Sequence, residues 1–295
     1  MKPAPFRFAA PACLSEALEL TREYGDRCKV LAGGQSLGPL LNLRLSTPEV
    51  LIDLGRIAEL ADPPCAGHRR VSVGAMTTQY TVEVSPLVAQ QIPLLAAAMP
   101  YVAHRTIRNR GTIGGSIAHA DPSAEIPAVA VAAAAEFTVR SASSSRAIPA
   151  EQFFTGYFST VLEPDEIVTS VSFPMRAERQ GGSWAEFAPR RGDFGIVGVA
   201  AMLRLDGSAS RIVDCRLVYS GIADRPWYAP EVTADCIGQA PEVELFAHVA
   251  EQAARACSPV DDAAGSADYR RNLVHHLSTK ALLGAAASIG GEGKP

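Results

Sequence analysis

A run of eight residues near the N-terminus, VLAGGQSL at 30–37, has the composition of a backbone site for a phosphate. Gly33 and Gly34 end an apolar run, and Ser36 stands where a helix is expected to begin. Adjacent glycines let the backbone approach a ligand closely, and the first N–H groups of a helix favour an anion. The same glycines would also suit a tight strand-to-helix connection that binds nothing. Both interpretations stay open for this segment alone.

A second glycine cluster, RGTIGGS at 110–116, offers the same kind of chemistry. It combines Gly114 and Gly115 with the hydroxyls of Thr112 and Ser116. No lysine follows either cluster as in a P-loop, and no three glycines have the G-x-G-x-x-G spacing of a dinucleotide fingerprint. A diphosphate held here would therefore need N–H donors from both loops, with glycines that leave room for its approach.

Other kinds of site are excluded by residue type and spacing. The six cysteines stand singly, without a C-x-x-C pair or neighbouring histidines, so we expect neither disulfides nor an iron–sulfur or zinc site. No nucleophile–base pattern is present, and we predict no catalytic residue and no metal ligand in this chain. A net charge of −4 gives no sign of a nucleic-acid partner. Without a secretion signal or an apolar run that could span a bilayer, a cytoplasmic location is predicted.

The elements that must position these clusters alternate between helix and strand in the first part of the chain. Gly25 is expected to stop a helix, and Ser36 to act as an N-cap. Asp121 is expected to cap an Ala/Val-rich helix with Pro122 in its first turn. The expected elements are a helix over 14–25, a strand over 28–33, a helix over 36–45, strands over 49–55 and 69–78, a helical region over 86–103, and strands over 136–140 and 165–174.

The composition changes at residues 175–183, which are charged and then glycine-rich and are typical of a linker. Beyond it the pattern predicts a set of antiparallel strands followed by two helices near 243–257 and 267–287. This order is typical of a second α+β domain. The expected strands cover 184–189, 196–207 and 211–221.

Two segments resemble the paired signatures of a flavoprotein family. AGGQSLGPLLNLRLSTPEVLIDL and IRNRGTIGGSIAHADPSAEIPAV are similar to the FAD-binding, medium subunit of molybdenum hydroxylases, the xanthine oxidase and carbon monoxide dehydrogenase superfamily. GAMTT, LEPDEIV and RRGDFGIVGVAAML also appear in order, so the resemblance covers nearly the whole chain.

The resemblance implies an α+β fold with two domains. Residues 1–176 would form a two-part FAD-binding domain of the PCMH type, with a small α/β part over 1–57 and a larger part with a mixed or antiparallel sheet over 58–176. Residues 183–288 would form a C-terminal domain like that of the CO dehydrogenase flavoprotein, with a small antiparallel sheet and helices.

The resemblance also implies which residues bind the cofactor. Both glycine loops would hold the FAD diphosphate, Glu125 would lie near the sugar-alcohol chain or ribose, and Val102 and Val168 would lie beside the flavin, with Asp193 as a further candidate. From the residues alone, Glu125 could be a first-turn carboxylate and Asp193 a turn residue paired with a nearby arginine. The implied set is Val30, Leu31, Ala32, Gly33, Gly34, Gln35, Ser36, Leu37, Val102, Thr112, Ile113, Gly114, Gly115, Ser116, Glu125, Val168 and Asp193.

One position departs from the family pattern. Some relatives carry a lysine directly after the phenylalanine that matches Phe187, whereas this chain has Ala188. No cation beside the flavin is therefore implied.

The function implied by the resemblance is electron transfer. FAD would be bound non-covalently, since neither loop contains His or Cys. A large molybdopterin-binding subunit and a small [2Fe–2S] subunit would carry the molybdenum cofactor and two clusters, in a dimer of heterotrimers. Electrons would leave through this FAD to an external acceptor such as NAD⁺ or a quinone. The alternatives are a free-standing FAD-dependent oxidoreductase with its own substrate site and a scaffold that has lost its flavin.

Overall fold

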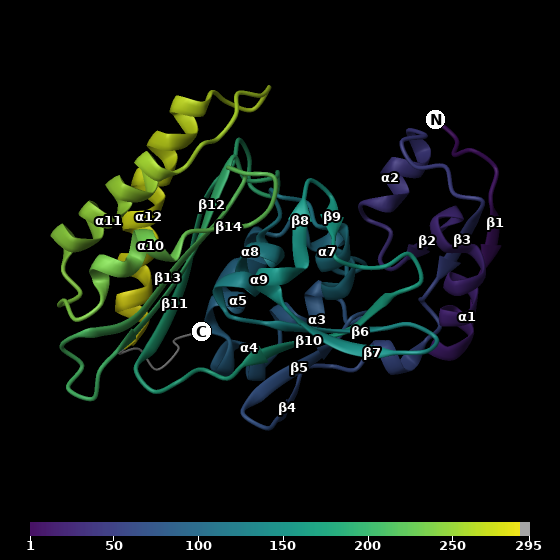
Figure 1. The fold of residues 1–295 in the computed structure, drawn as a ribbon, viewed down its shortest axis with the longest axis horizontal. Coiled ribbons are helices and arrows are strands. Elements are labelled where there is room, and N and C mark those ends of the chain that lie inside the picture. The colour runs from purple at the N-terminus through teal and green to yellow at the C-terminus, as the bar shows by residue number, and fades with distance from the viewer. Residues whose placement is uncertain (290–295) are drawn as a thin grey trace.

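The protein is described by a computed structural model, which covers residues 1–289. Three parts follow one another across the molecule, with the N-terminal part at one end and the C-terminal helices at the other (Figure 1). Helices and antiparallel sheets occur together, so the expected α+β fold is confirmed. Among the described helices, none combines the length and the apolar composition that crossing a membrane would require.

The N-terminal part is a small parallel sheet with strand order β1-β3-β2. Leu14, Ala17 and Leu18 lie on one face of α1 and pack into a core with residues of β2 and β3. Gly25 ends α1 with a φ of +49°, as the sequence predicted. The elements are β1 (Arg7–Ala9), α1 (Leu14–Tyr24), η1 (Gly25–Arg27), β2 (Cys28–Leu31), α2 (Leu37–Asn42), β3 (Val50–Asp53) and η2 (Ala58–Leu60).

The middle part is an antiparallel five-stranded sheet with the order β4-β5-β10-β6-β7, covered by short helices. Its elements are β4 (Cys65–Gly67), β5 (Arg70–Gly74), α3 (Gln79–Glu83), α4 (Pro86–Gln91), α5 (Pro93–Ala98), η3 (Met99–Tyr101), α6 (Arg105–Arg108), α7 (Ile113–His119), α8 (Glu125–Ala132), β6 (Glu136–Arg140), β7 (Ser145–Pro149), α9 (Ala150–Phe153), β8 (Phe154–Gly156), β9 (Ser159–Thr160) and β10 (Ile167–Pro174).

The C-terminal part is an antiparallel sheet with the order β11-β12-β13-β14 between two layers of helices. Helices α11 and α12 cover its outer face, while α5 and α8 of the middle part pack against the inner face (Figure 1). The elements are β11 (Gln180–Phe187), β12 (Val197–Leu205), β13 (Ile212–Ser220), β14 (Trp227–Tyr228), α10 (Pro230–Thr233), η4 (Ala234–Cys236), α11 (Val243–Ala256) and α12 (Ala267–Ile289).

One expectation about local structure is wrong. Asp121 does not cap the Ala/Val-rich helix: α8 begins four residues later, at Glu125, and the Asp121 carboxylate instead accepts a hydrogen bond from the Ser123 N–H at 2.9 Å. The apolar region 86–103 is helical as expected and consists of separate helices, because Pro93 starts a new helix after the break at Ile92.

The glycines of the predicted linker are part of a strand. β11 starts at Gln180, and a Cβ on Gly181 would overlap the Ala285 carbonyl of α12. A Cβ on Gly182 would lie 2.9 Å from the Leu94 Cβ of α5. Here glycine allows helices to approach the strand closely on both faces, and it is not a sign of a flexible connection.

Candidate functional site

The first loop leaves a run of backbone donors free. The loop, residues 32–36, follows directly after β2. Gly34 adopts a left-handed conformation with φ +74°, which favours glycine. The five N–H groups from Gly33 to Leu37 have no hydrogen-bond acceptor within residues 1–289. Ser36 is the N-cap residue of α2, as expected, but its hydroxyl makes no capping bond. Unpaired N–H groups in a half-buried loop are suited to bind an anion.

The second loop uses four of its backbone donors, those of residues 113–116, in hydrogen bonds within the protein. The Ile113 and Gly114 N–H groups donate to the Thr77 and Ala75 carbonyls at 3.1 and 2.8 Å. The Gly115 N–H donates to the Thr112 hydroxyl at 3.0 Å, and the Ser116 N–H donates to the Thr112 carbonyl. The Thr112 N–H has no acceptor among residues 1–289, so N–H donors from both loops remain a prediction.

What the second loop can still offer is hydroxyl groups. The Ser116 hydroxyl has no partner among the described residues, and the Thr112 hydroxyl accepts one bond and donates none. Backbone donors from the first loop, with the Thr112 N–H and two hydroxyls of the second, therefore make up the candidate anion site.

The two loops are in direct contact. A Cβ on Gly33 would overlap the Arg110 carbonyl oxygen, and one on Gly115 would lie 3.2 Å from the Ala32 Cβ. A Cβ on Gly114 would overlap the side chain of Ala75. The glycines at 33 and 114 therefore permit contacts within the protein, whereas the expectation was that they leave room for a ligand.

A third segment, residues 75–79, supports the second loop and was not predicted as part of the site. Besides receiving the N–H groups of Ile113 and Gly114, it pairs Thr78 with Thr112, and the Gln79 N–H donates to the Gly111 carbonyl at 2.8 Å. The GAMTT sequence that precedes Gln79 was one of the segments carrying the resemblance. Its position at the end of a predicted strand was the available signal.

The predicted apolar residues lie close to these loops in the core. Val102 and Val168 are buried in the same hydrophobic cluster as Ile113 and Ile117 of α7. Val168 lies in β10 beside an irregularity in its pairing with β6, and the Val102 carbonyl accepts a hydrogen bond from Arg108 at 2.9 Å. Val30, Leu31 and Leu37 are half-buried at the two ends of the first loop.

Glu125 is a buried carboxyl at the start of α8. It is 5% exposed and makes no side-chain hydrogen bond within the described chain. Burial, with a smaller contribution from the charge of Glu186, raises the pKa of Glu125 to about 8. This environment differs from that of a solvated first-turn carboxylate, which was the alternative interpretation of this residue.

Asp193 lies in an exposed turn and forms no ion pair in the part of the chain that the structure describes. Its N–H donates to the Arg190 carbonyl at 3.1 Å. The turn packs on His104, since a Cβ on Gly192 would lie 2.5 Å from the imidazole Cε1. Ala188 follows β11 and is half-buried. The alternative interpretation of Asp193 as a turn residue is met, but its pairing with a neighbouring arginine is not observed among the described residues.

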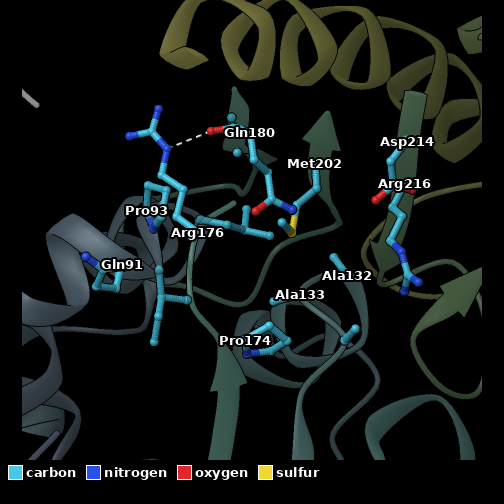
Figure 2. Close-up of a pocket in the computed structure, with 15 residues that line it drawn as sticks. Gln91, Pro93, Ala132, Ala133, Pro174, Arg176, Gln180, Met202, Asp214 and Arg216 are labelled. Carbon is cyan, nitrogen blue, oxygen red and sulfur yellow. Dashed lines mark hydrogen bonds between the residues drawn. The ribbon is translucent and has the colours of Figure 1, made fainter. Parts of the chain in front are cut away.

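A cavity of about 180 Å³ lies apart from these loops, between the middle and C-terminal parts. Figure 2 shows its apolar wall of Pro93, Pro174 and Met202 and the hydrogen bond from Arg176 to the Gln180 carbonyl, which measures 2.7 Å. None of the predicted site residues lines it. Across residues 1–289, no three His, Cys, Asp or Glu side chains form a group that could hold a metal ion.

Comparison with known proteins matches both parts of the chain to known domain families. Residues 4–176 match the family described as FAD binding domain in molybdopterin dehydrogenase, and residues 183–285 match the CO dehydrogenase flavoprotein C-terminal domain. The nicotine 6-hydroxylase medium subunit of Paenarthrobacter nicotinovorans is 38% identical over 97% of this chain and 99% of its own. The carbon monoxide dehydrogenase medium chain of Hydrogenophaga pseudoflava is 34% identical, with coverages of 97% and 99%.

Solved structures agree with these matches. A carbon monoxide dehydrogenase structure from Hydrogenophaga pseudoflava, which lacks the Mo-pyranopterin moiety of the molybdenum cofactor, superimposes with a TM-score of 0.94 at 34% identity, covering 98% of this chain and 99% of that one. Quinoline 2-oxidoreductase from Pseudomonas putida 86 gives a TM-score of 0.92 at 34% identity, with the same coverages. The chain therefore belongs to the FAD-binding, medium-subunit family of the molybdenum hydroxylases and is an FAD-binding oxidoreductase subunit.

Proposed function

We propose that this chain is the electron-transfer subunit of a molybdenum-containing hydroxylase or dehydrogenase, and that it passes electrons from [2Fe–2S] clusters of a partner to an external acceptor. The observation that carries the proposal is the run of unpaired N–H groups from Gly33 to Leu37, held against the second loop. A diphosphate is the anion that such a run, together with nearby hydroxyls, is suited to bind.

The residues of the chain fit FAD as follows. The N–H groups of Gly33 to Leu37 would donate to the phosphate oxygens, and the Thr112 and Ser116 hydroxyls would donate from the other side. Glu125 would lie at a hydroxyl of the sugar-alcohol chain or ribose, and Val102 and Val168 would contact the apolar ring. Asp193 would belong to the turn near the flavin. FAD supplies the redox chemistry, and the protein supplies binding, orientation and a controlled environment.

The partners follow from the names of the relatives. Two are called a medium subunit or medium chain, and another is called the 6-hydroxypseudooxynicotine dehydrogenase complex subunit alpha. We infer a large subunit with the molybdenum cofactor and a small subunit with the [2Fe–2S] clusters, assembled as a dimer of heterotrimers in the cytoplasm. The domain organisation proposed for this chain is an FAD-binding domain over 1–176 and a C-terminal domain over 183–288.

The test is purification of the tagged chain from its native host. We expect two co-purifying subunits, molybdenum and iron in the assembly, and one FAD per copy of this chain. Acid precipitation should release the FAD into the supernatant, because the proposed binding is non-covalent; flavin that stays in the pellet would contradict this. A colourless protein that takes up no added FAD would contradict the proposed site. A free chain that steadily oxidises an organic substrate without molybdenum or iron would favour a free-standing flavoenzyme.

A further inference from the structure

A buried arginine at the end of α6, Arg108, ties together two segments close to the second loop. Its side chain is 10% exposed. The Nε–H and an Nη2–H donate to the two carboxylate oxygens of Glu83, the last residue of α3, at 2.8 and 2.9 Å. The Nη1 group donates to the carbonyls of Val102 and Ala103, both at 2.9 Å. The guanidinium therefore makes four hydrogen bonds, two to a carboxylate and two to the backbone.

The segment that Arg108 holds is a turn with an unusual backbone conformation. Ala103 has a φ of +44°, in the left-handed region that residues other than glycine rarely adopt. Among residues 1–289, the one hydrogen bond made by the backbone of Ala103 is the bond that its carbonyl accepts from Arg108. The His104 carbonyl accepts the N–H of Arg108 at 3.1 Å. Both the side chain and the main chain of Arg108 thus hold this turn.

Residues 102–104 connect places that are predicted to lie around the flavin. Val102 is buried in the same hydrophobic cluster as Val168 of β10. His104 packs against the turn that is predicted to lie near the flavin from the C-terminal part, since a Cβ on Gly192 would lie 2.5 Å from the imidazole Cε1. A change of φ at the residue between Val102 and His104 would move one of these side chains relative to the other.

We propose that Arg108 is a positioning residue for the flavin. Its hydrogen bonds hold Ala103 in the left-handed conformation, which places Val102 against the flavin ring and His104 against the turn of the C-terminal part. Arginine suits this role because its planar guanidinium pairs with a carboxylate along one edge while it donates to carbonyls from the other, which the ammonium of lysine does not reproduce. The inference rests on the proposed function, since it places FAD beside Val102.

Loss of these bonds should weaken FAD binding by an amount that the backbone conformation sets. Without Arg108, Ala103 can relax to a negative φ, and FAD binding then has to restore the left-handed conformation. For a residue with a Cβ, this conformation corresponds to a factor of about 5 to 30 in an equilibrium constant. Glycine adopts the same φ without that cost. Ala103→Gly should therefore compensate for the loss of Arg108.

The experiment titrates the FAD-free, full-length chain with FAD. Four variants are compared with wild type: Arg108→Lys, Ala103→Gly, the double variant with both changes, and the control Arg176→Lys. Arg176 also donates to backbone carbonyls, at 2.7 and 2.9 Å, but it lines the cavity that lies apart from the loops. The dissociation constant should be about 5 to 30 times higher in Arg108→Lys. The other three variants should bind FAD with values close to that of wild type.

The absorption spectrum of the bound flavin gives a reading that a merely structural role would not change. At saturating FAD, the visible bands of Arg108→Lys should differ from those of wild type, because Val102 no longer has the same position against the ring. The double variant should show the wild-type spectrum. Identical spectra in wild type and Arg108→Lys would contradict the proposed positioning.

The rescue by glycine distinguishes positioning from a general loss of stability. Wild-type affinity in Arg108→Lys, or a double variant that binds as weakly as Arg108→Lys, would overturn the inference and leave the proposed function intact. If Arg108→Lys does not fold, Ala103→Val takes its place, because a β-branched residue disfavours a positive φ while the ion pair is kept. Wild-type affinity in Ala103→Val would then overturn the inference. Failure of wild type to bind FAD would refute the proposed function and this inference with it.

Discussion

Gly33 and Arg110 are in contact through their backbones, so that a Cβ on Gly33 would overlap the Arg110 carbonyl oxygen and lie 2.8 Å from the Gly111 Cα. This contact fixes the first loop against the second before any cofactor is considered. The free N–H groups of one loop are thereby held next to the hydroxyls of the other. A ligand that binds both loops then loses little of its binding energy in ordering them.

Gly33→Ala should separate the loops and sharply lower FAD occupancy. The added methyl group has no room against the Arg110 carbonyl, and backbone cannot move aside as a flexible side chain could. The matched control is Gly38→Ala in α2, where a Cβ would meet nothing within 4 Å. This control should retain FAD and gain about 0.5–1 kcal/mol of stability from helix propensity. Flavin content per chain and thermal unfolding measure both effects, and full occupancy in Gly33→Ala would contradict the prediction.

Ser116→Ala should weaken FAD binding about tenfold or more. A hydrogen bond to a charged group contributes about 1.5–3 kcal/mol, and 1.4 kcal/mol corresponds to a factor of ten. The fold should be unaffected, since the hydroxyl has no partner among residues 1–289. Ser210→Ala, in an exposed turn, is the control. Titration of the FAD-free protein with FAD gives both dissociation constants, and equal values would remove Ser116 from the site.

The free energy of unfolding should depend on pH through Glu125. Its pKa is about 8 in the folded protein and near 4.5 in an ordinary environment, so the folded state keeps a proton that the unfolded chain releases between these values. The contribution of this group to stability is full below pH 4.5 and is lost as pH rises to about 8. One pKa unit corresponds to about 1.4 kcal/mol, so the loss is on the order of a few kcal/mol.

Denaturant unfolding of the FAD-free protein between pH 5 and 9 checks this dependence. The difference in stability between Glu125→Gln and wild type should increase in favour of the variant as pH rises. A difference that stays constant over the whole range would show that Glu125 ionises normally.

Trp184 should report the ionisation of Glu186. The chain contains two tryptophans, so Trp227→Phe leaves Trp184 as the single tryptophan. Its indole N–H donates to the Glu186 carboxylate, whose pKa is raised to about 7 by burial. Fluorescence should therefore change with a midpoint near pH 7, and the change should disappear in Trp227→Phe with Glu186→Gln. Emission that does not vary with pH would contradict the assigned pKa shift.

Local sequence pattern predicted the elements whose signals are local. Gly25 ends α1, and the two helices expected near 243–257 and 267–287 are observed as α11 and α12, within a few residues of those bounds. The second loop could not be predicted in the same way. The N–H groups of Ile113 and Gly114 donate to the carbonyls of Thr77 and Ala75, more than thirty residues earlier in the chain, and no local pattern contains that pairing.

The remaining errors have a similar origin. Gly181 and Gly182 have the composition of a linker. In the structure they are required because α12 and α5 approach the strand closely from its two faces. Glu125 was placed in the site by family resemblance, and its burial without an ion-pair partner among the described residues is a property of the folded molecule, in which α8 packs against β12 and β13. The burial of a side chain and its hydrogen-bond or ion-pair partners are properties of the folded molecule. They cannot be predicted from the residue type alone, although they determine the chemistry of the side chain.

The hydrophobic core does not stop where the chain passes from one sequence family to the other. Trp184, Ala200 and Val218 of the C-terminal sheet belong to the same cluster as α8, all eight residues of which are buried. Exchange of C-terminal domains between relatives at residues 177–182 would cut through this cluster. A functional chimera should therefore transfer α8 together with the sheet that covers it. The segment that must be exchanged as a unit is thus longer than the C-terminal domain defined by sequence.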